Sequence, residues 1–232
     1  MVYKLSLFPL LDLLLPMTCG LCDARTGSNF PLCNDCLEEM PSITCSCPQC
    51  ALPATTSATC GACQQNPPAF DRVVALYHYQ PPVNTLVQQM KFSNRLEYST
   101  LFGHLLAERL AAMDARPDLL VPVPLHHSRL RKRGYNQSWE ITRSLARSSG
   151  IESSRTLCCR VRKTPLQTGL DARQRRKNLK QAFRVTADLG GKHVCIIDDV
   201  MTTGSTLNEM ARTLKRAGAE RVSGWVVARV VL

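Results

Sequence analysis

Two adjacent carboxylates, Asp198 and Asp199, lie between an apolar run and a loop rich in hydroxyl groups. Residues 194–197 are apolar and mostly β-branched, which predicts a strand buried on both faces of a parallel sheet that ends at the acid pair. The loop amides and hydroxyls suit a phosphate, whereas the carboxylates suit sugar hydroxyls or a divalent metal ion. The loop consists of Thr202, Thr203, Gly204, Ser205 and Thr206.

A helix is predicted directly after this loop, because apolar residues repeat at helical spacing between 207 and 214. Thr206 and Glu209 fit a capping box at its start, and Gly218 is expected to end it. Strand, acids, loop and helix N-terminus together indicate an anion site at the carboxyl end of a sheet strand. A phosphorylated ribose satisfies both halves of this motif.

Other phosphate-binding motifs are missing from the sequence. Neither GxxxxGK[ST] nor GxGxxG occurs, which argues against a P-loop NTPase and against a Rossmann dehydrogenase. The alternative interpretation is a βα turn that merely happens to be polar. Such a turn does not need two acids and four hydroxyl groups, so we favour the binding site.

Nine of the twelve cysteines precede residue 64, and eight of them form CxxC pairs. Clustering of this kind indicates metal ligation in a reducing cytosol, and two pairs complete one closed four-thiolate site, so two structural zinc ions are predicted. The spacing leaves open whether the pairs combine sequentially or crossed, and whether Cys45 replaces Cys47. The predicted ligands are Cys19, Cys22, Cys33, Cys36, Cys47, Cys50, Cys60 and Cys63.

The formal net charge of +11 is concentrated in one stretch, because residues 128–184 hold 16 basic and 3 acidic side chains. This stretch predicts a polyanionic partner, either pyrophosphate, nucleic acid or both. Basic residues at helical spacing after residue 172 predict a lid over a charged substrate, with a solvated charged helix as the alternative. The candidates are Arg129, Arg131, Lys132 and Arg133 for nucleic acid, and Arg133, Arg173, Arg176 and Lys177 for pyrophosphate or the lid.

Strands alternate with helices after residue 68, which predicts an α/β domain over 69–232 with a parallel sheet and flanking helices. Residues 1–68 are predicted to form a cysteine-rich module with an N-terminal amphipathic helix. The apolar run 10–15 is too short to span a membrane. Strands are expected at 71–79, 119–124, 156–162, 182–186 and 222–231, and helices at 83–91 and 98–113, with another helix reaching about 147.

Lys91, His126 and His127 are three further polar residues whose roles the sequence predicts less specifically. Lys91 is either a helix-end cation or a phosphate contact, and the two readings are about equal. The adjacent His126 and His127 would point in different directions on a strand, so we interpret them as surface residues and not as a metal pair.

Several sequence blocks, taken in order, resemble the ComF/GntX family of bacterial double-zinc phosphoribosyltransferase-like proteins. The acid run itself resembles the phosphoribosyl-pyrophosphate motif of type I phosphoribosyltransferases. The matching blocks are the CxxC pairs, Met90–Phe92, Val121–Pro124, Arg131–Ser138, Gln167–Leu170, Arg176–Phe183 and the acid pair. The resemblance covers nearly the whole chain and implies the type I phosphoribosyltransferase fold behind a zinc module.

The resemblance also implies a site and a biological setting. Asp198 and Asp199 would hold the ribose hydroxyls of phosphoribosyl pyrophosphate, directly or through Mg²⁺, and residues 202–206 would hold its 5′-phosphate. Val123, Pro124 and Leu125 resemble the family's pyrophosphate loop. The protein would be cytoplasmic and linked to natural transformation and DNA uptake, with single-stranded DNA and DNA-processing proteins as partners.

Two functions remain open at this point. The first is a phosphoribosyltransferase with an unknown acceptor, since almost nothing follows Val231 where many type I enzymes carry base-reading residues. The second is a non-catalytic module that senses phosphoribosyl pyrophosphate or binds single-stranded DNA with the same fold.

Overall fold

A computed structural model describes residues 17–113, 116–162 and 181–231. The chain divides into two compact units, Met1–Met40 and Pro41–Leu232. The first unit contains the short helix α2 (Asn34–Glu38). Residues 41–68, which carry the last four predicted zinc ligands, thus lie in the same compact unit as the sheet. The predicted N-terminal helix lies outside the described residues.

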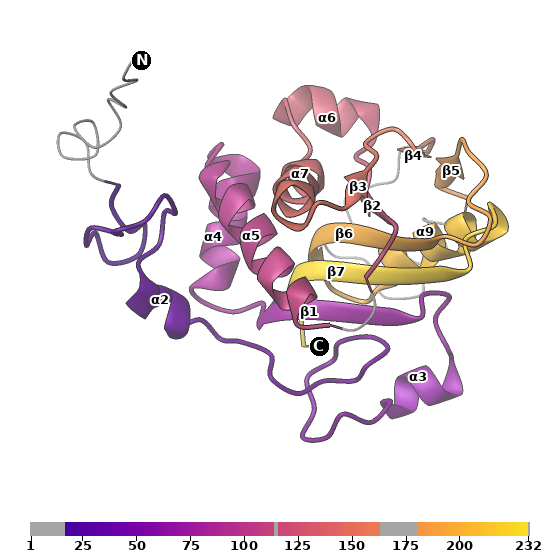
Figure 1. Cartoon of the computed structure of the whole chain (residues 1–232), viewed down its shortest axis with the longest axis horizontal. Helices are drawn as coiled ribbons and strands as arrows, with labels where there is room; N and C mark the ends of the chain where they lie inside the picture. The colour runs from indigo at the N-terminus through magenta and orange to yellow at the C-terminus, as the bar shows by residue number, and fades with distance from the viewer. Residues whose placement is uncertain (1–16, 114–115, 163–180, 232) are drawn as a thin grey trace, which may run out of the picture. The chain divides into compact units, whose positions relative to one another are not determined.

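Five parallel strands form the central sheet, in the order β1-β7-β6-β2-β3 (Figure 1). The inner strands β6 and β7 have neighbours on both sides and are almost entirely buried, which explains their near-continuous apolar sequences. The predicted α/β class with a parallel sheet is therefore confirmed. The strands are β1 (Arg72–His78), β2 (Leu119–Pro122), β3 (Glu152–Ser153), β6 (His193–Met201) and β7 (Arg221–Arg229).

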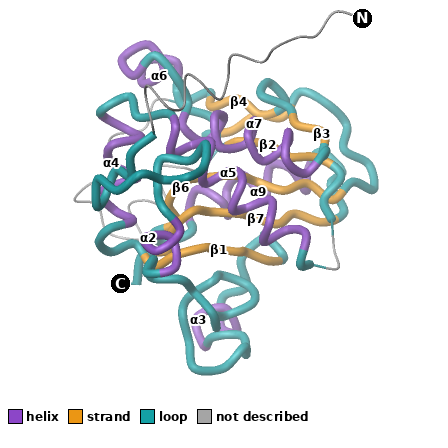
Figure 2. The backbone as a smooth tube through the Cα atoms, turned by 60° about the vertical axis from the view of Figure 1, so that its left-hand side comes forward, coloured by secondary structure: helices purple, strands orange, loops and turns teal. Residues whose placement is uncertain are grey.

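Helices cover both faces of this sheet (Figures 1 and 2). Helices α5 and α7 pack against each other on one face, where the Cβ of any residue replacing Gly103 would lie 2.4 Å from the Cβ of Ser144. Helix α9 packs on the opposite face, with Leu207 and Met210 in the core. The helices are α4 (Val83–Phe92), α5 (Glu97–Ala111), α6 (His127–Arg133), α7 (Gln137–Ser149) and α9 (Ser205–Arg216).

The topology creates a crevice between β2 and β6. The two strands are neighbours, but α7, the second helix after β2, packs on one face and α9, the helix after β6, packs on the other. Such a switch point leaves the carboxyl ends of both strands open to a ligand. The acid pair and the loop after β2 meet at this edge, where the Val123 amide donates to the Ile197 carbonyl at 2.9 Å.

The end of β6 differs from the prediction. The strand does not stop at the acids but continues to Met201, with Asp198 paired to Val226 and Met201 paired to Arg229 of β7. The run of apolar residues in β6 ends at the acids. The hydrogen bonds between β6 and β7 continue past them, because β7 extends beside β6 as far as Met201. The acids are therefore held by a strand and not by a loop.

The segment after β2 also differs from the prediction, because it contains α6 where a loop was expected. His126 is the N-cap of this helix and accepts a hydrogen bond from the Ser128 amide at 3.3 Å, while Gly134 ends the helix with φ +84°. His126 is buried, so its interpretation as a surface residue was wrong, whereas His127 is exposed.

The predicted strands at 156–162 and 182–186 are shorter than expected and lie apart from the parallel sheet. They form β4 (Cys158–Arg160) and β5 (Phe183–Val185), which pair with each other in antiparallel orientation. The stretch between them, which holds the predicted lid, includes residues 163–180 outside the described part of the chain.

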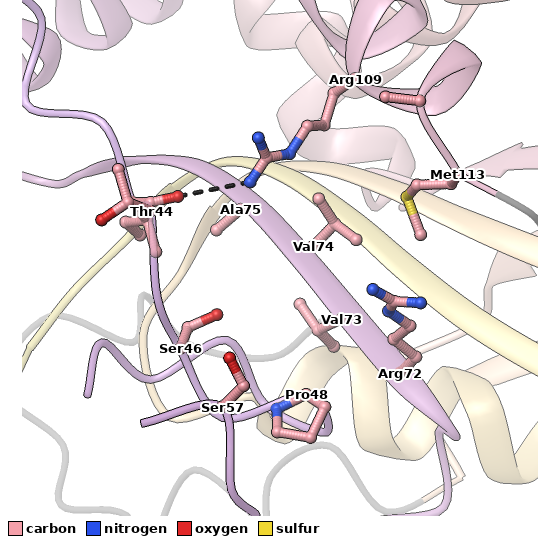
Figure 3. Close-up of a pocket in the computed structure, with 12 residues that line it drawn as sticks. Thr44, Ser46, Pro48, Ser57, Arg72, Val73, Val74, Ala75, Arg109 and Met113 are labelled. Atoms are coloured by element: carbon pink, nitrogen blue, oxygen red, sulfur yellow. Dashed lines mark hydrogen bonds between the residues drawn. The ribbon is translucent and has the colours of Figure 1, made fainter. Parts of the chain in front are cut away.

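Residues 41–68, which include α3 (Gly61–Gln65), extend the sheet unit beyond β1 (Figure 2). The Ile43 amide donates to Leu76 at 2.9 Å, and the His78 amide donates to Pro41 at 2.8 Å, so this segment pairs with the outer edge of β1 and covers it. A cavity of about 300 Å³ lies between this segment, β1 and the end of α5, beside the Arg109 guanidinium that donates to Ile43 (Figure 3).

The described part of the chain holds no helix with the length and apolar character that a membrane crossing requires.

Candidate functional site

The eight predicted cysteine ligands gather in two sequential clusters. The four Sγ atoms of each cluster lie within 4.8 Å of one another, and the separations of Cys22 from Cys33 and of Cys50 from Cys60 are both 3.7 Å. Tetrahedral zinc with bonds of about 2.3 Å requires sulfur separations of about 3.8 Å, so the donor sets fit structural zinc. Tertiary structure thereby settles the pairing that the spacing left open.

Cys45 belongs to neither cluster. Its sulfur lies 3.6 Å from the hydroxyl of Ser57, whereas Cys47 takes the ligand position. Cys158 is buried and Cys159 half-buried, as expected for thiols outside a metal site.

The acid pair is buried at the carboxyl end of β6. Asp198 and Asp199 are 9% and 4% exposed, and Asp198 Oδ1 accepts hydrogen bonds from the Ser138 hydroxyl at 2.9 Å and from the Asp199 amide at 3.0 Å. Ser138 lies in the first turn of α7, so the helix that follows β2 orients a carboxylate on the neighbouring strand. This hydrogen bond leaves the second oxygen of Asp198 for a ligand.

Lys91 supplies the nearest positive charge. Its Nζ lies 2.9 Å from Asp199 Oδ2, and outside this ion pair that oxygen accepts no hydrogen bond from any residue that the structure describes. The last turn of α4 therefore brings a cation onto the acid pair, which is a role that neither sequence interpretation of Lys91 included. A ligand cation or hydroxyl would compete for the same oxygen.

Burial dominates the protonation of Asp198. The pKa is raised from 3.8 to about 7 in total, with burial as the largest cause and the adjacent charge of Asp199 as the next, while Lys91 and Ser138 oppose the rise. Two carboxylates this close cannot both ionise easily without a cation. The pair therefore gains most from a ligand that brings either a metal ion or hydroxyl donors.

The loop after β6 reverses the chain into α9. Gly204 occupies the N-cap with φ +75°, a conformation that side chains other than glycine rarely adopt, and the hydroxyls of Thr203 and Ser205 lie 2.8 Å apart. No side chain caps the helix, and Glu209 instead accepts a hydrogen bond from the Gln181 amide at 2.7 Å. The predicted capping box was wrong. The Ser205 amide donates to the Thr203 hydroxyl at 3.4 Å, and no described side chain accepts from the next amides of α9, which can donate to an anion.

These groups line one cavity of about 300 Å³. Both acids and all five predicted loop residues contribute to it, as do Val123 and Leu125 from the loop after β2. Lining residues that the sequence did not assign to the acid site are Tyr79, Lys91, Arg129, Gln137 and Arg160.

Two arginines give this cavity a basic wall. The pKa of Arg160 is lowered to about 10, first by burial and then by the nearby charge of Arg129, while Asp198 opposes the fall. Burial also lowers the pKa of Arg129, followed by the charge of Arg133. Buried guanidinium groups close to other cations mark a place where an anion would be favourable. The lone Arg160 in a predicted strand carried no signal of this role, whereas Arg129 was assigned to nucleic acid.

Other predicted residues lie away from the cavity. Pro124 is buried, and Arg131 and Lys132 are exposed on α6. Arg133 donates to the Gln137 side chain at 2.5 Å, with its guanidinium 5.4 Å from the ring centroid of Phe92. The lid candidates Arg173, Arg176 and Lys177 lie outside the described residues.

Comparisons with known proteins agree with both parts of the chain. The phosphoribosyl transferase domain family matches residues 100–230, and the double zinc ribbon domain family matches residues 10–64. DNA utilization protein YhgH of Escherichia coli O157:H7 is 38% identical over 228 residues, which cover 94% of this chain and all of that protein. Competence protein F of Haemophilus influenzae is 35% identical over 222 residues, which cover 90% of each chain.

A more distant relative and a solved structure are also similar. Competence protein ComFC of Bacillus subtilis is 24% identical over 245 residues, which cover 92% of this chain and 95% of that protein. Purine phosphoribosyltransferase from Pyrococcus horikoshii Ot3 aligns with a TM-score of 0.35 and 18% identity, over 68% of this chain and 91% of that one.

Metal analysis of the purified protein should return about two zinc ions per chain, because two clusters each offer four thiolates. Replacing Cys60 by serine should lower this to about one, measured by inductively coupled plasma mass spectrometry. Cys45→Ser is the matched control and should leave the zinc content unchanged. One zinc per chain in the unmodified protein would contradict the two-cluster assignment.

The raised pKa of Asp198 predicts a pH-dependent stability. The folded state binds this proton more tightly than the unfolded chain does, so the contribution is complete below about pH 4 and is lost as pH rises through about 7. Between pH 6 and 8, the free energy of unfolding in urea should fall more steeply for the unmodified protein than for Asp198→Asn, with zinc kept saturating.

The difference between the two profiles isolates Asp198, because groups such as His193 titrate alike in both proteins. Parallel profiles across this pH range would show that Asp198 is already ionised at pH 6.

Proposed function

Because this chain belongs to the family of double-zinc-ribbon phosphoribosyltransferase-domain proteins that includes DNA utilization protein YhgH and competence protein F, we propose that it binds phosphoribosyl pyrophosphate. We further propose that it transfers the phosphoribosyl group of this ligand to an acceptor. One observation carries the proposal. A single cavity brings together the buried acid pair, the hydroxyl-rich loop at the N-terminus of α9 and a wall of two arginines.

Each part of the ligand has a chemically matched part of this cavity. The 5′-phosphate fits the loop 202–206, where the uncapped helix amides and hydroxyls can donate to it. The ribose hydroxyls fit Asp198 and Asp199, which accept hydrogen bonds. The pyrophosphate fits Arg129, Arg160 and the main chain near Val123 at the neighbouring strand end.

The donor set also fits Mg²⁺ brought in with the ligand, because Mg²⁺ is commonly bound by one or two carboxylates together with substrate phosphates. Asp198 and Asp199 would hold it, and when bound it would neutralise charge on the pyrophosphate. The metal would displace Lys91 from Asp199 or share that oxygen with it.

The reaction needs no covalent nucleophile from the protein. The bond between the anomeric carbon and the pyrophosphate oxygen breaks, the pyrophosphate leaves with the electron pair, and an acceptor forms the new bond while losing a proton. The fixed charges of Arg129 and Arg160 would stabilise the developing negative charge on the leaving group, and the acid pair would stabilise the positive charge on the ribose.

Replacing both acids by asparagine should weaken the binding of phosphoribosyl pyrophosphate at least tenfold. Each carboxylate contributes charge-assisted hydrogen bonds worth about 1.5–3 kcal/mol, and each 1.4 kcal/mol is a factor of ten. Isothermal titration calorimetry with Mg²⁺ present measures the loss, with the exposed Asp188→Asn as control. Equal affinity in the double variant would refute the assignment of the site.

Pyrophosphate release, with nucleobases and single-stranded DNA offered as acceptors, tests turnover separately. Binding without release under any of these conditions would favour a sensing role over transfer.

A second candidate function is the binding of single-stranded nucleic acid, and a specific surface favours it. Phe92 is 76% exposed, Arg133 lies over its ring, and Arg131 and Lys132 are exposed on α6. An exposed aromatic ring beside clustered cations is the usual platform for unpaired bases and their phosphates. The relatives' names, DNA utilization protein YhgH and competence protein F, agree with such a surface.

Charge reversal of Arg131, Lys132 and Arg133 should weaken single-stranded DNA binding and flatten its dependence on salt concentration. Three lost phosphate contacts should reduce the slope of log K against log salt by about 2, since each contributes about 0.7 for single strands. Fluorescence anisotropy across a salt series measures this slope. Charge reversal of the exposed Lys192 and Arg216 is the matched control, and an equal effect there would refute the α6 surface.

A further inference from the structure

Arg229, the last residue of β7, is buried without a carboxylate partner among the described ion pairs. It is 7% exposed, and its guanidinium donates to main-chain carbonyls instead. Nε donates to Cys50 at 3.1 Å, and one terminal nitrogen donates to Met201 at 3.2 Å and also to Thr202 and Val230. A buried charge is tolerated only when its environment compensates it, so these carbonyls and their surroundings are matched to this side chain.

The accepting carbonyls come from two different sites. Cys50 is a ligand of the second cysteine cluster, whereas Met201 and Thr202 begin the loop proposed to bind the 5′-phosphate. Arg229 also pairs with Met201 across the sheet, so its side chain and main chain hold the same point of the loop. One guanidinium thereby connects a zinc knuckle with the phosphate loop.

Packing supports the loop only in part on this side. The side chains of Met201 and Phe70 lie beside Gly204. A cavity of about 640 Å³ nevertheless lies between the second cluster and the rear of the loop, and its walls include Cys60, Cys63, Thr203, Gly204 and Ser205. The hydrogen bonds of Arg229 at the start of the loop therefore add to a packing that is incomplete.

The negative charge of the second cluster also favours its contact with Arg229. Four thiolates around a divalent zinc ion carry a net charge of about −2, and Arg229 donates directly to the main chain of one of these ligands. Loss of the metal would free the Cys47–Cys50 knuckle from its tetrahedral geometry. Arg229 would then lose a fixed acceptor, and the carbonyls of Met201 and Thr202 would lose a fixed donor.

We propose that the second cysteine cluster is part of the phosphate site, with Arg229 as the positioning residue that makes the conformation and phosphate affinity of loop 202–206 depend on zinc in that cluster. The affinity half of this inference rests on the proposed function. The conformational half does not, because the loop can be observed without any ligand.

Two variants break the connection at opposite ends. Arg229→Met removes the donor, and Cys60→Ser removes zinc from the second cluster. Each should raise amide hydrogen exchange at residues 202–206 about tenfold relative to the zinc-loaded unmodified protein, measured by mass spectrometry on the full-length chain, and should weaken phosphoribosyl pyrophosphate binding by a similar factor. Arg229→Lys keeps the charge and should give an intermediate result, which preserves the test if the methionine variant does not fold.

The matched control is Cys22→Ser in the first cluster, which belongs to the other compact unit. It should lose one zinc ion but leave loop exchange and affinity unchanged. The double variant of Arg229→Met with Cys60→Ser should be no worse than either single variant, because both interrupt one connection, whereas independent destabilisation would add.

Unchanged loop exchange in both Arg229→Met and Cys60→Ser would overturn the inference, as would an equal response to Cys22→Ser. If the unmodified protein does not bind phosphoribosyl pyrophosphate, the proposed function fails while hydrogen exchange still decides whether the second cluster controls the loop.

Discussion

The burial of two neighbouring carboxylates in a central strand is the constraint on which the rest of this site depends. Asp198 and Asp199 belong to β6, which continues beside β7 past the acids, and both side chains are buried. Their mutual repulsion and desolvation are offset by Lys91 from α4 and by Ser138 from α7. Three separate elements must therefore be in place before the acid pair is tolerated, which ties the site to the completed fold.

The sheet topology places the acid pair beside the other groups of the site. Placing α7 and α9 on opposite faces opens the crevice between β2 and β6, so the acids, the loop after β2 and the N-terminus of α9 share one edge. The cavity is lined by both kinds of charge, the carboxylates of Asp198 and Asp199 and the guanidinium groups of Arg129 and Arg160. A ligand that carries hydroxyls in the middle and phosphates at both ends matches this combination of charges, and it would relieve both kinds of repulsion at once.

The cysteine clusters have different structural settings. The first belongs to the unit that ends at Met40, whereas the second lies in the unit of the sheet and covers the edge of β1. A closed four-thiolate site has no open position for chemistry, so its contribution must come through what it holds. Arg229 donates both to Cys50 of the second cluster and to Met201 and Thr202 at the start of loop 202–206, and these hydrogen bonds are the basis for the proposed connection between the cluster and the ligand site.

The sequence by itself determined the residue chemistry: the acid pair, the hydroxyl-rich loop, eight metal ligands and the alternation of strands and helices in a parallel α/β fold. These features depend on local spacing and side-chain type, which remain visible without a structure. Tertiary structure decided the sequential pairing of the cysteines, the ion pair of Lys91, the two arginines that line the cavity and the hydrogen bonds of Arg229. It also showed that β6 continues beyond the acids and that Glu209 does not cap α9. The physical reason is that each of these depends on which segments become neighbours: β7, the last strand in sequence, lies between β1 and β6, and no local pattern encodes that placement.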